Sequence, residues 1–295
     1  MKHVAKVLIA IGIGLVIVLV ILAGVGAWFV WRPWPTVNGT LTISGLLAPV
    51  EVIRDEWGVP HIYAENEHDL FFAQGYVHAQ DRLWQMEFNR RIGSGTLSAV
   101  LGEATLDTDR FLRTIGLRRA AEQDWAQSED ETRAIMEAYA EGVNAYIETH
   151  RDRLPLEFTI LGVDPAPWTP VDTLAWGKVM SFDLGSNYEF ELLRARMIAE
   201  LGQEAAQQLL PPYAEGAPVI IPPETRSYAW LRDARFGGLD ALAAVLGERG
   251  PTSGSNNWVI HGSRTATGMP ILADDTHLGL NMPSIWYENG LHGGR

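Results

Sequence analysis

The chain of 295 residues contains no cysteine. It therefore has neither a disulfide framework nor a thiol nucleophile. Positive charge is also scarce, since 23 Lys and Arg stand against 36 Asp and Glu, for a formal net charge of −13. Such an acidic balance argues against a nucleic-acid binder and against a protein that adheres to anionic lipid. With 47% apolar and 20% charged residues, the chain can build a large core.

The sequence motifs of several common chemistries are missing as well. We find no Walker loop, no HExxH pair, no GxSxG turn and no GxGxxG that follows a strand. These absences argue against P-loop nucleotide binding, zincin-type hydrolysis, a nucleophile elbow and a dinucleotide-binding fold.

The most distinct segment is an uncharged apolar run at residues 7–31, preceded by Lys2 and Lys6 and followed by Arg32. A helix of that length rises about 37 Å, enough to span a hydrocarbon core of about 30 Å. The run predicts a transmembrane anchor, with residues 1–6 cytoplasmic and the rest exported by the positive-inside rule. The alternative is a cleaved signal peptide, although the run exceeds the usual apolar region of about 7 to 15 residues.

Helical periodicity dominates the first two hundred residues. The sequence predicts loose β alternation over residues 41–53, and then helices over residues 69–91, from a Ser128–Glu131 capping box, from Thr169-Pro170, and over residues 189–201, with Asp69 capping the first of them. Composition changes at residues 203–254, where Pro and Gly clusters predict a spacer or linker. Strands are predicted beyond it, at residues 257–261 and 269–273.

The stretch GSNNWVIHGS at residues 254–263 places a serine directly after the spacer. A serine hydroxyl needs a base and an oxyanion-stabilising donor before it acts as a nucleophile. If the Gly254–Ser255 bond were broken, the freed α-amine of Ser255, with a reference pKa near 8, could serve as that base. On these residues alone, Gly-Ser after such a stretch is more often a plain linker.

Four segments in order carry a resemblance to a known family. They are VEVIRDEWGVPHIYA at residues 50–64, GYVHAQDRLWQMEFNRRIGSGTLSAVLG at 75–102, LPLEFTILGVDPAPWTPVDTLAWGKVM at 154–180, and GSNNWVIHGSRTATGMPILADDTHLGL at 254–280. Together they resemble the penicillin acylases, which are N-terminal nucleophile hydrolases. The resemblance implies an α+β fold, a four-layer αββα sandwich that would be incomplete in this chain, with a mostly helical small-chain part after the transmembrane helix.

The resemblance also implies a precursor that cleaves itself at Gly254–Ser255, with Ser255 as the nucleophile. Residues 38–202 would be the small-chain region, 203–254 the spacer, and 255–295 the start of a large chain. The implied reaction is hydrolysis of the acyl amide of a β-lactam, an acyl-homoserine lactone or a lipopeptide. No organic cofactor is implied.

Further residues match positions of the family, each with a plainer alternative. His277 would orient the amine of Ser255 or a bridging water, and its alternative is a core histidine. Asp274 and Asp275 beside it are interpreted as turn residues, because a triad or a metal site needs more partners. Glu191 would supply a carboxylate to a structural calcium, and its alternative is a glutamate on a helix surface.

Two groups of residues complete the implied site. Met180, Phe182, Leu184 and Tyr188 would line the acyl pocket, with ordinary core packing as the alternative for each. Scaffold residues would form a buried polar lattice that joins small and large chains: Arg54, Asp55, His78, Gln80, Asp81, Arg82, Arg90 and Arg91.

The family's large chain continues for several hundred residues and supplies the oxyanion-hole donors, so we expect this chain to be a fragment that is inactive alone. Two rival functions remain open from the sequence. One is a membrane-anchored, non-catalytic binding or assembly protein on an acylase scaffold. The other is a conventional serine hydrolase that uses His277 as its base and leaves the chain uncut.

Overall fold

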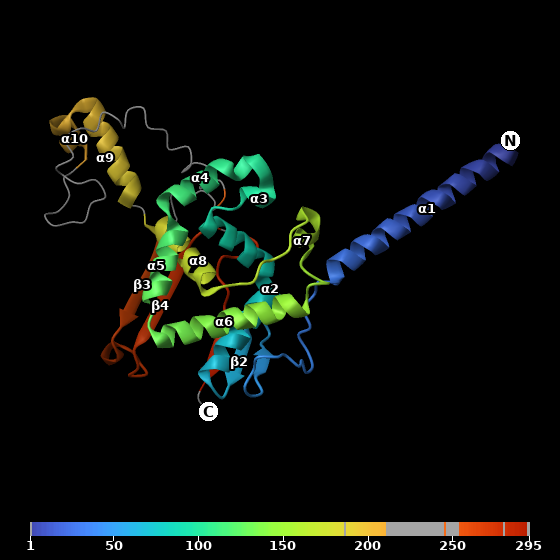
Figure 1. The fold of residues 1–295 in the computed structure, drawn as a ribbon, viewed down its shortest axis with the longest axis horizontal. Coiled ribbons are helices and arrows are strands. Elements are labelled where there is room, and N and C mark those ends of the chain that lie inside the picture. Colours follow the sequence, from blue (N-terminus) through green and yellow to red (C-terminus); the bar gives the residue numbers. More distant parts are fainter. Residues whose placement is uncertain (1, 186, 211–244, 246–253, 280, 294–295) are drawn as a thin grey trace. The chain divides into compact units, whose positions relative to one another are not determined.

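The computed structural model describes residues 2–185, 187–210, 245, 254–279 and 281–293, and the described chain is mostly helical with few strands (Figure 1). The α-helices are α1 (Lys2–Trp31), α2 (Glu67–Ser94), α3 (Ser98–Leu101), α4 (Leu106–Ile115), α5 (Leu117–Gln127), α6 (Asp130–Thr149), α7 (Leu156–Leu161), α8 (Pro170–Leu184), α9 (Asn187–Leu201) and α10 (Gln203–Leu209). The strands are β1 (Glu51–Arg54), β2 (Pro60–Ala64), β3 (Gly254–Ile260), β4 (Ile271–His277) and β5 (Gly290–Gly293).

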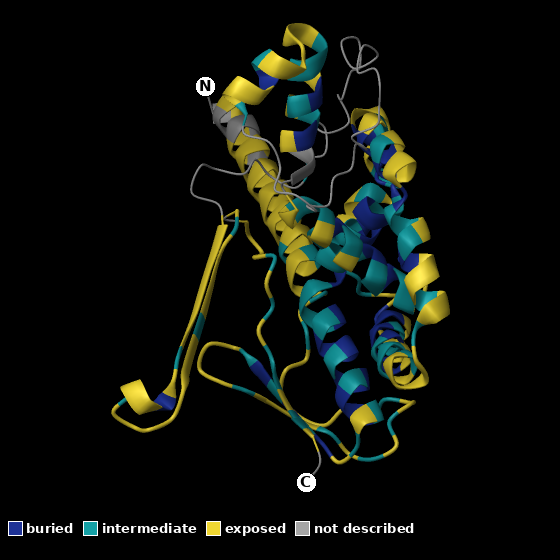
Figure 2. Ribbon diagram, turned by 90° about the vertical axis from the view of Figure 1, so that its left-hand side faces the viewer, coloured by how far each residue is buried: buried dark blue, intermediate teal, exposed yellow. Residues whose placement is uncertain are grey.

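Helix α1 contains the apolar run found in the sequence. Its part from Ile11 to Trp31 has a mean hydropathy of 2.8 and is long and apolar enough to cross a membrane. None of that part is buried against the rest of the chain, as the exposed colouring of the helix in Figure 2 also shows. The structure therefore confirms a long apolar helix.

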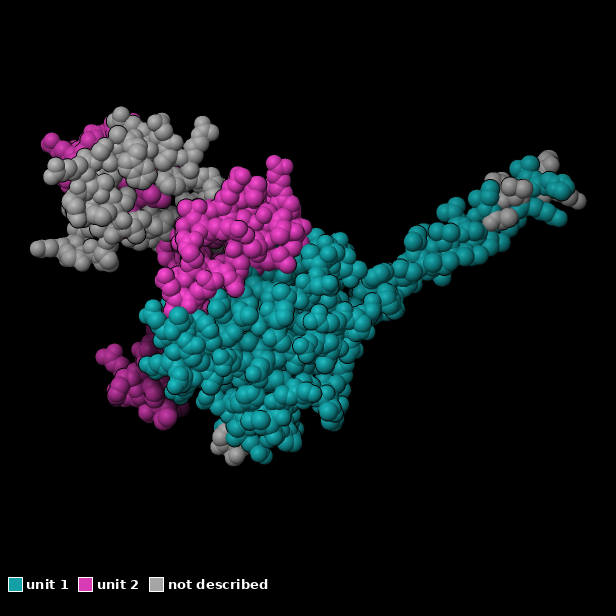
Figure 3. Space-filling model, viewed as in Figure 1, with its two compact units in different colours: residues 1–90, 124–172, 286–295 teal, residues 91–123, 173–285 magenta. Residues whose placement is uncertain are grey.

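The chain divides into two compact units, one of residues 1–90, 124–172 and 286–295, and the other of residues 91–123 and 173–285 (Figure 3). In the first unit, β1 pairs antiparallel with β2, and β2 pairs parallel with β5. The register sets His61 against Gly290 and Tyr63 against His292. Residues 286–293 thus return to the segment that opens the fold.

Helices α2 and α6 supply the core of the first unit. Tyr76, Val143 and Tyr146 are buried in one apolar cluster, and Ile62 and Val77 in a second cluster beneath the sheet. The two helices approach closely at two glycines, because a Cβ on Gly75 would overlap the carbonyl oxygen of Tyr139, and one on Gly142 would overlap that of Phe72. Only glycine allows backbones to come this near.

The second unit includes the short helices around Asp109 and the β3–β4 hairpin. Asp109 is buried and accepts hydrogen bonds from the backbone nitrogens of Leu97 and Ser98, both at 2.8 Å. The hairpin pairs Gly254 with His277 at its open end and Ile260 with Ile271 near its turn. Trp258, Val259 and Ile260 on β3 and Ile271 on β4 are aromatic or β-branched residues, which favour strands.

Several sequence predictions need correction. Residues 41–50 form no strand, and β1 begins only at Glu51. Asp69 does not cap the helix. Instead, Asn66 Oδ1 accepts the Asp69 backbone N–H at 2.8 Å, and the Asp69 carboxylate accepts the backbone N–H of Leu47 at 2.9 Å. Ser128 forms no capping box, because its hydroxyl donates to Asp124 O at 2.9 Å. Residues 203–209 of the predicted spacer form α10, and most of the remainder up to residue 253 lies outside the described residues.

Candidate functional site

Ser255 lies at the start of β3, directly opposite Thr276 on β4. Gly254 is the first residue of the same strand and pairs with His277. Both residues of the predicted scissile bond are exposed. A strand pairing therefore holds this bond in an extended conformation at the open end of the hairpin, where a histidine stands across from it.

His277 is 46% exposed at its side chain, so the alternative of a core histidine is wrong. Its Nε2 lies 3.7 Å from Asp275 Oδ2. Asp274 and Asp275 belong to β4, where they pair with Asn257 and Asn256, so the interpretation as turn residues is also wrong. Asp275 and His277 are two residues apart on one strand and share a face.

The hairpin register also separates the serine hydroxyl from the imidazole. Directly paired residues on antiparallel strands share a face, and successive residues alternate faces. Ser255 shares its face with Thr276, whereas His277 lies on the face of Gly254. The imidazole is thus set beside the Gly254–Ser255 peptide group and on the opposite face from the Ser255 hydroxyl.

The four predicted pocket residues belong to α8 and α9 of the second unit. Met180 and Phe182 are partly buried, and the Phe182 ring lies 6.0 Å from that of Phe111. Leu184 is 48% exposed, and the side chain of Tyr188 lies outside the described residues. The three described side chains are thus partly buried or exposed rather than fully buried.

Glu191 is 3% exposed, so the alternative of a surface glutamate is wrong. A buried carboxylate is a suitable cation ligand, but calcium takes about 6 to 8 oxygen ligands. Within the described part of the chain, no group of three His, Cys, Asp or Glu side chains converges as a metal site. Glu191 is therefore a single candidate ligand that would need further oxygen ligands to hold a calcium ion.

A polar lattice joins the segments before and after Ser255 within the first unit. Arg54 binds the Asp81 carboxylate through both terminal nitrogens, at 2.7 and 3.0 Å. The Tyr287 hydroxyl donates to Asp81 Oδ2 at 2.5 Å, and Arg54 also donates to Gln80 Oε1 at 2.9 Å. Arg82 lies over the Tyr287 ring, 5.6 Å from its centre. The predicted lattice is confirmed at these residues.

Two other predicted lattice residues have different partners. Asp55 closes the tight turn between β1 and β2, where its Oδ1 accepts the Trp57 and Val59 backbone N–H groups at 2.9 Å, and its Oδ2 lies 3.9 Å from His61 Nε2. Arg90 is buried, pairs with Glu87, and donates to Ala166 O at 3.0 Å within the helical core.

His78 forms a second link across the same boundary. Its Nε2 accepts from Asn289 Nδ2 at 3.2 Å, and Gln74 Nε2 donates to Asn289 Oδ1 at 3.2 Å. With Nε2 as the acceptor, Nδ1 carries the proton and donates to the Tyr139 hydroxyl at 2.9 Å. Tyr287 and Asn289 were not predicted from the sequence, because only the return of residues 286–293 to β2 brings them here.

Burial lowers the pKa of His78 to about 4, with Arg82 adding to that effect and Asp81 opposing it. In the unfolded chain the pKa is about 6.5. Between these values the unfolded state binds a proton that the folded state does not, so the free energy of unfolding decreases as the pH falls from 6.5 to 4. We expect a loss of at most about 3 kcal/mol from this residue, complete near pH 4.

Urea denaturation at several pH values tests whether His78 causes this loss of stability at low pH. His78→Gln should flatten the decrease between pH 6.5 and 4. Tyr139→Phe is the matched control, because it removes the Nδ1 partner without removing the group that titrates. It should lower stability by a similar amount at pH 7 and pH 5. An unchanged pH dependence in His78→Gln would contradict the assignment.

Comparisons with known proteins agree on one group of enzymes. A family model described as Penicillin amidase matches residues 49–295. The penicillin acylase 2 proenzyme of Pseudomonas sp. (strain SE83) is 36% identical over 264 residues, which are 87% of this chain and 34% of that protein. Acyl-homoserine lactone acylase QuiP of Pseudomonas aeruginosa is 35% identical over 276 residues, 90% of this chain and 32% of that protein.

Among solved structures, the thermostable penicillin G acylase from Alcaligenes faecalis is similar at a TM-score of 0.48 and 32% identity, over 59% of this chain and 97% of that chain. The chain spans about a third of the length of the curated relatives that it matches.

Proposed function

The chain belongs to the penicillin amidase family, and from this premise we propose that it carries the nucleophile of an amide hydrolase that matures by cutting its own backbone at Gly254–Ser255. The observation that carries this proposal is the β3–β4 register, in which His277 stands opposite Gly254 and Ser255 is the second residue of β3. The names of the relatives, penicillin acylase and acyl-homoserine lactone acylase, support cleavage of an acyl amide.

In the proposed maturation, the Ser255 hydroxyl oxygen attacks the Gly254 carbonyl carbon. The C–N bond breaks, an ester forms, and the hydroxyl proton passes to the departing nitrogen, which becomes the α-amine of Ser255. Water then hydrolyses the ester, leaving a Gly254 carboxylate and a free hydroxyl. Glycine suits the position before the nucleophile because it adds no side chain to hinder the attack. His277 and Asp275, on the face of Gly254, are suited to exchange protons with water near this peptide.

In the proposed turnover, the same hydroxyl attacks the substrate's amide carbonyl. The freed amine accepts the hydroxyl proton and delivers it to the leaving amine, which departs and leaves an acyl-enzyme that water hydrolyses. His277 would orient that amine or a bridging water. Met180, Phe182, Leu184 and Tyr188 would contact the acyl group of a β-lactam, an acyl-homoserine lactone or a lipopeptide.

The hairpin supports this function over a conventional Ser–His hydrolase. In that alternative, the imidazole must accept a hydrogen bond from the Ser255 hydroxyl. The register instead sets the side chains of Ser255 and His277 on opposite faces of the two strands. An amine attached to the serine itself needs no such approach.

The proposal also covers helix α1, the sheets, the processed segments and a metal ligand. Helix α1 would anchor the protein in the membrane with its catalytic part on the extracytoplasmic side, and the sheets would complete an αββα sandwich with further strands of a large chain. Residues 38–202 would be the small-chain region, 203–254 the removable spacer and 255–295 the start of the large chain. The buried carboxylate of Glu191 would join ligands from elsewhere in the protein around a structural calcium.

N-terminal sequencing of the matured protein, made from its complete gene, tests the proposal. We expect one terminus to read Ser-Asn-Asn-Trp, and the intact mass to divide into two chains at Gly254–Ser255. The same preparation should hydrolyse members of a panel of acyl amides with graded chain length. Sequencing that finds only the translation start or a signal-processed end would contradict the proposal.

A further inference from the structure

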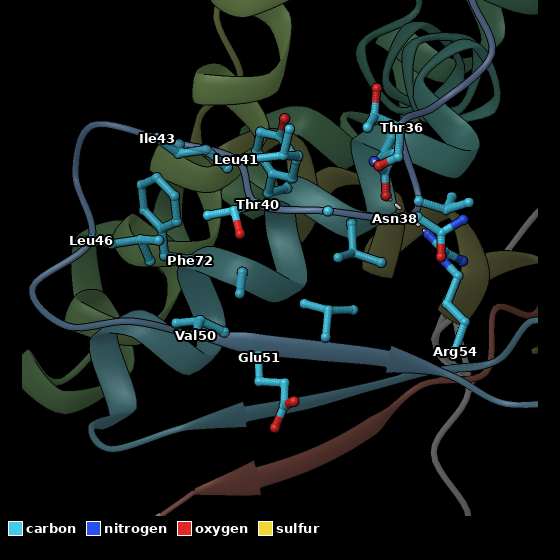
Figure 4. Close-up of a pocket in the computed structure, with 17 residues that line it drawn as sticks. Thr36, Asn38, Thr40, Leu41, Ile43, Leu46, Val50, Glu51, Arg54 and Phe72 are labelled. Atoms are coloured by element: carbon cyan, nitrogen blue, oxygen red, sulfur yellow. Dashed lines mark hydrogen bonds between the residues drawn. The ribbon is translucent and has the colours of Figure 1, made fainter.

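A short segment between α1 and β1 crosses over the core of the first unit as a strap, which we define as residues 36–46. Its start is held by Gln80, whose Nε2 donates to Thr36 O at 3.0 Å. Just past its end, the backbone nitrogens of Leu47 and Ala48 donate to the buried Asp69 carboxylate at 2.9 and 2.8 Å. The strap is thus fixed at both ends, and Figure 4 shows it arching over β1 and Phe72.

A cavity of about 420 Å³ lies beneath this strap, within the range of about 300–1,000 Å³ typical of small-ligand sites. Apolar side chains from three elements line it: Leu41, Ile43 and Leu46 from the strap, Val52 from β1, and Phe72 and Val77 from α2. Asn38, Thr40 and Gln80 add uncharged polar groups, and Glu51 and Arg54 add charged ones. A lining that combines apolar side chains with polar groups suits a ligand with a hydrocarbon body and a polar end.

The charges around the cavity favour an uncharged occupant. Arg54 lines the cavity, but Asp81 and Gln80 already occupy its guanidinium nitrogens. Glu51 also lines the cavity, but it is exposed, and its side chain extends from β1 away from the strap (Figure 4). Neither side chain is therefore placed to neutralise a charged ligand inside the cavity. A buried ion without a partner is strongly unfavourable, so an uncharged occupant is favoured.

The cavity lies close to α1 along the chain. Thr36 follows the end of α1 at Trp31 by five residues, which can span at most about 18 Å. Apolar side chains on both the strap and the end of the helix are exposed, including Val37 at 49% and Leu41 at 45% on the strap and Trp31 at 62% on α1. If α1 spans a bilayer, the mouth of the cavity is within reach of lipid at the membrane surface.

We propose that the cavity beneath the strap holds the acyl chain of a membrane lipid, so that residues 36–46, together with α1, hold the first unit against the bilayer. The inference rests on the proposed anchoring by α1. It assigns the strap a binding role separate from the Ser255 site, with Val52, Phe72 and Val77 contacting the hydrocarbon.

Photo-crosslinking tests this on the full chain in phosphatidylcholine vesicles that contain a trace of phosphatidylcholine with a diazirine near the end of one acyl chain. After irradiation, peptide mapping should find label on α1 and also on peptides of the strap, β1 and the Phe72–Val77 part of α2. Val52→Trp, which fills the cavity, should reduce label on the latter peptides at least fivefold and leave label on α1 unchanged.

Ile53→Trp is the matched control, because Ile53 belongs to the same strand, does not line the cavity and is 48% exposed. Ile53→Trp should leave the label on α1 and on the cavity peptides at the wild-type level, and circular dichroism should show that both variants are folded. Label on α1 alone would overturn the acyl-chain site and leave the anchor intact. Absence of label from α1 would overturn the anchor and this inference with it. Equal labelling of the cavity peptides in Val52→Trp and wild type would also overturn it.

Discussion

Replacing Ser255 with alanine should leave the precursor uncut, whereas the wild-type protein divides into two chains at Gly254–Ser255. The reason is chemical: alanine has no oxygen to attack the Gly254 carbonyl, so neither the ester nor the free amine can form. The effect on processing should be all or none, and hydrolysis of acyl amides should be lost with it. Denaturing gel electrophoresis and intact mass spectrometry measure the outcome directly.

Two variants make this test specific. Ser263→Ala removes another exposed serine of the same hairpin and should leave processing unchanged. Ser255→Cys keeps a nucleophile of similar size, and we expect processing to continue through a thioester. Because the wild-type chain has no cysteine, a thiol reagent would then label one site, at the new terminus. Normal cleavage of Ser255→Ala at Gly254–Ser255 would refute the assignment.

Gly75→Ala and Gly142→Ala should each destabilise the first unit by at least about 3 kcal/mol, at the upper end for an overpacked site. In each case the added methyl group would overlap a backbone carbonyl oxygen of the facing helix, that of Tyr139 or of Phe72. Backbone cannot move aside as a flexible side chain can, so α2 and α6 would have to separate and lose packing around Tyr76 and Val143. Urea denaturation followed by circular dichroism gives the free energy of unfolding.

Gly177→Ala is the matched control for these two variants. Gly177 also lies within a helix, α8, but a Cβ there would meet no atom within 4 Å. The substitution should therefore stabilise the protein by about 0.5–1 kcal/mol through helix propensity alone. If Gly75→Ala or Gly142→Ala behaved like Gly177→Ala, the close contact between α2 and α6 would be wrong.

The sequence predicts those elements whose pattern is long and local. The helix at residues 69–91 was predicted from its apolar spacing and the strand pair beyond Gly254 from short runs of strand-forming residues, and the structure has them as α2, β3 and β4 with shifted ends. Helices α3 to α5 were missed because they are short and interrupted by Gly102 and Gly116, which have positive φ. Strand β5 was missed because GLHG has two glycines and its partner is distant in sequence.

The candidate site was predictable to a similar extent. Ser255 and His277 follow from motif and resemblance, and the register then adds which face each side chain occupies. The contact of Asp275 with His277 could not be predicted, since two adjacent aspartates are equally typical of a turn. The deep burial of Glu191 depends on long-range packing, which helical spacing alone does not reveal.

The parallel pairing of β2 with β5 has a consequence for how the molecule is made. The imidazoles of His61 and His292 approach to 3.2 Å although the residues are 231 positions apart. A contact of such high sequence separation closes a very large loop and is slow to form. During synthesis, the edge of β2 that pairs with β5 therefore stays unpaired until residue 293 has been synthesised. An unpaired edge of this kind can associate with other nascent chains.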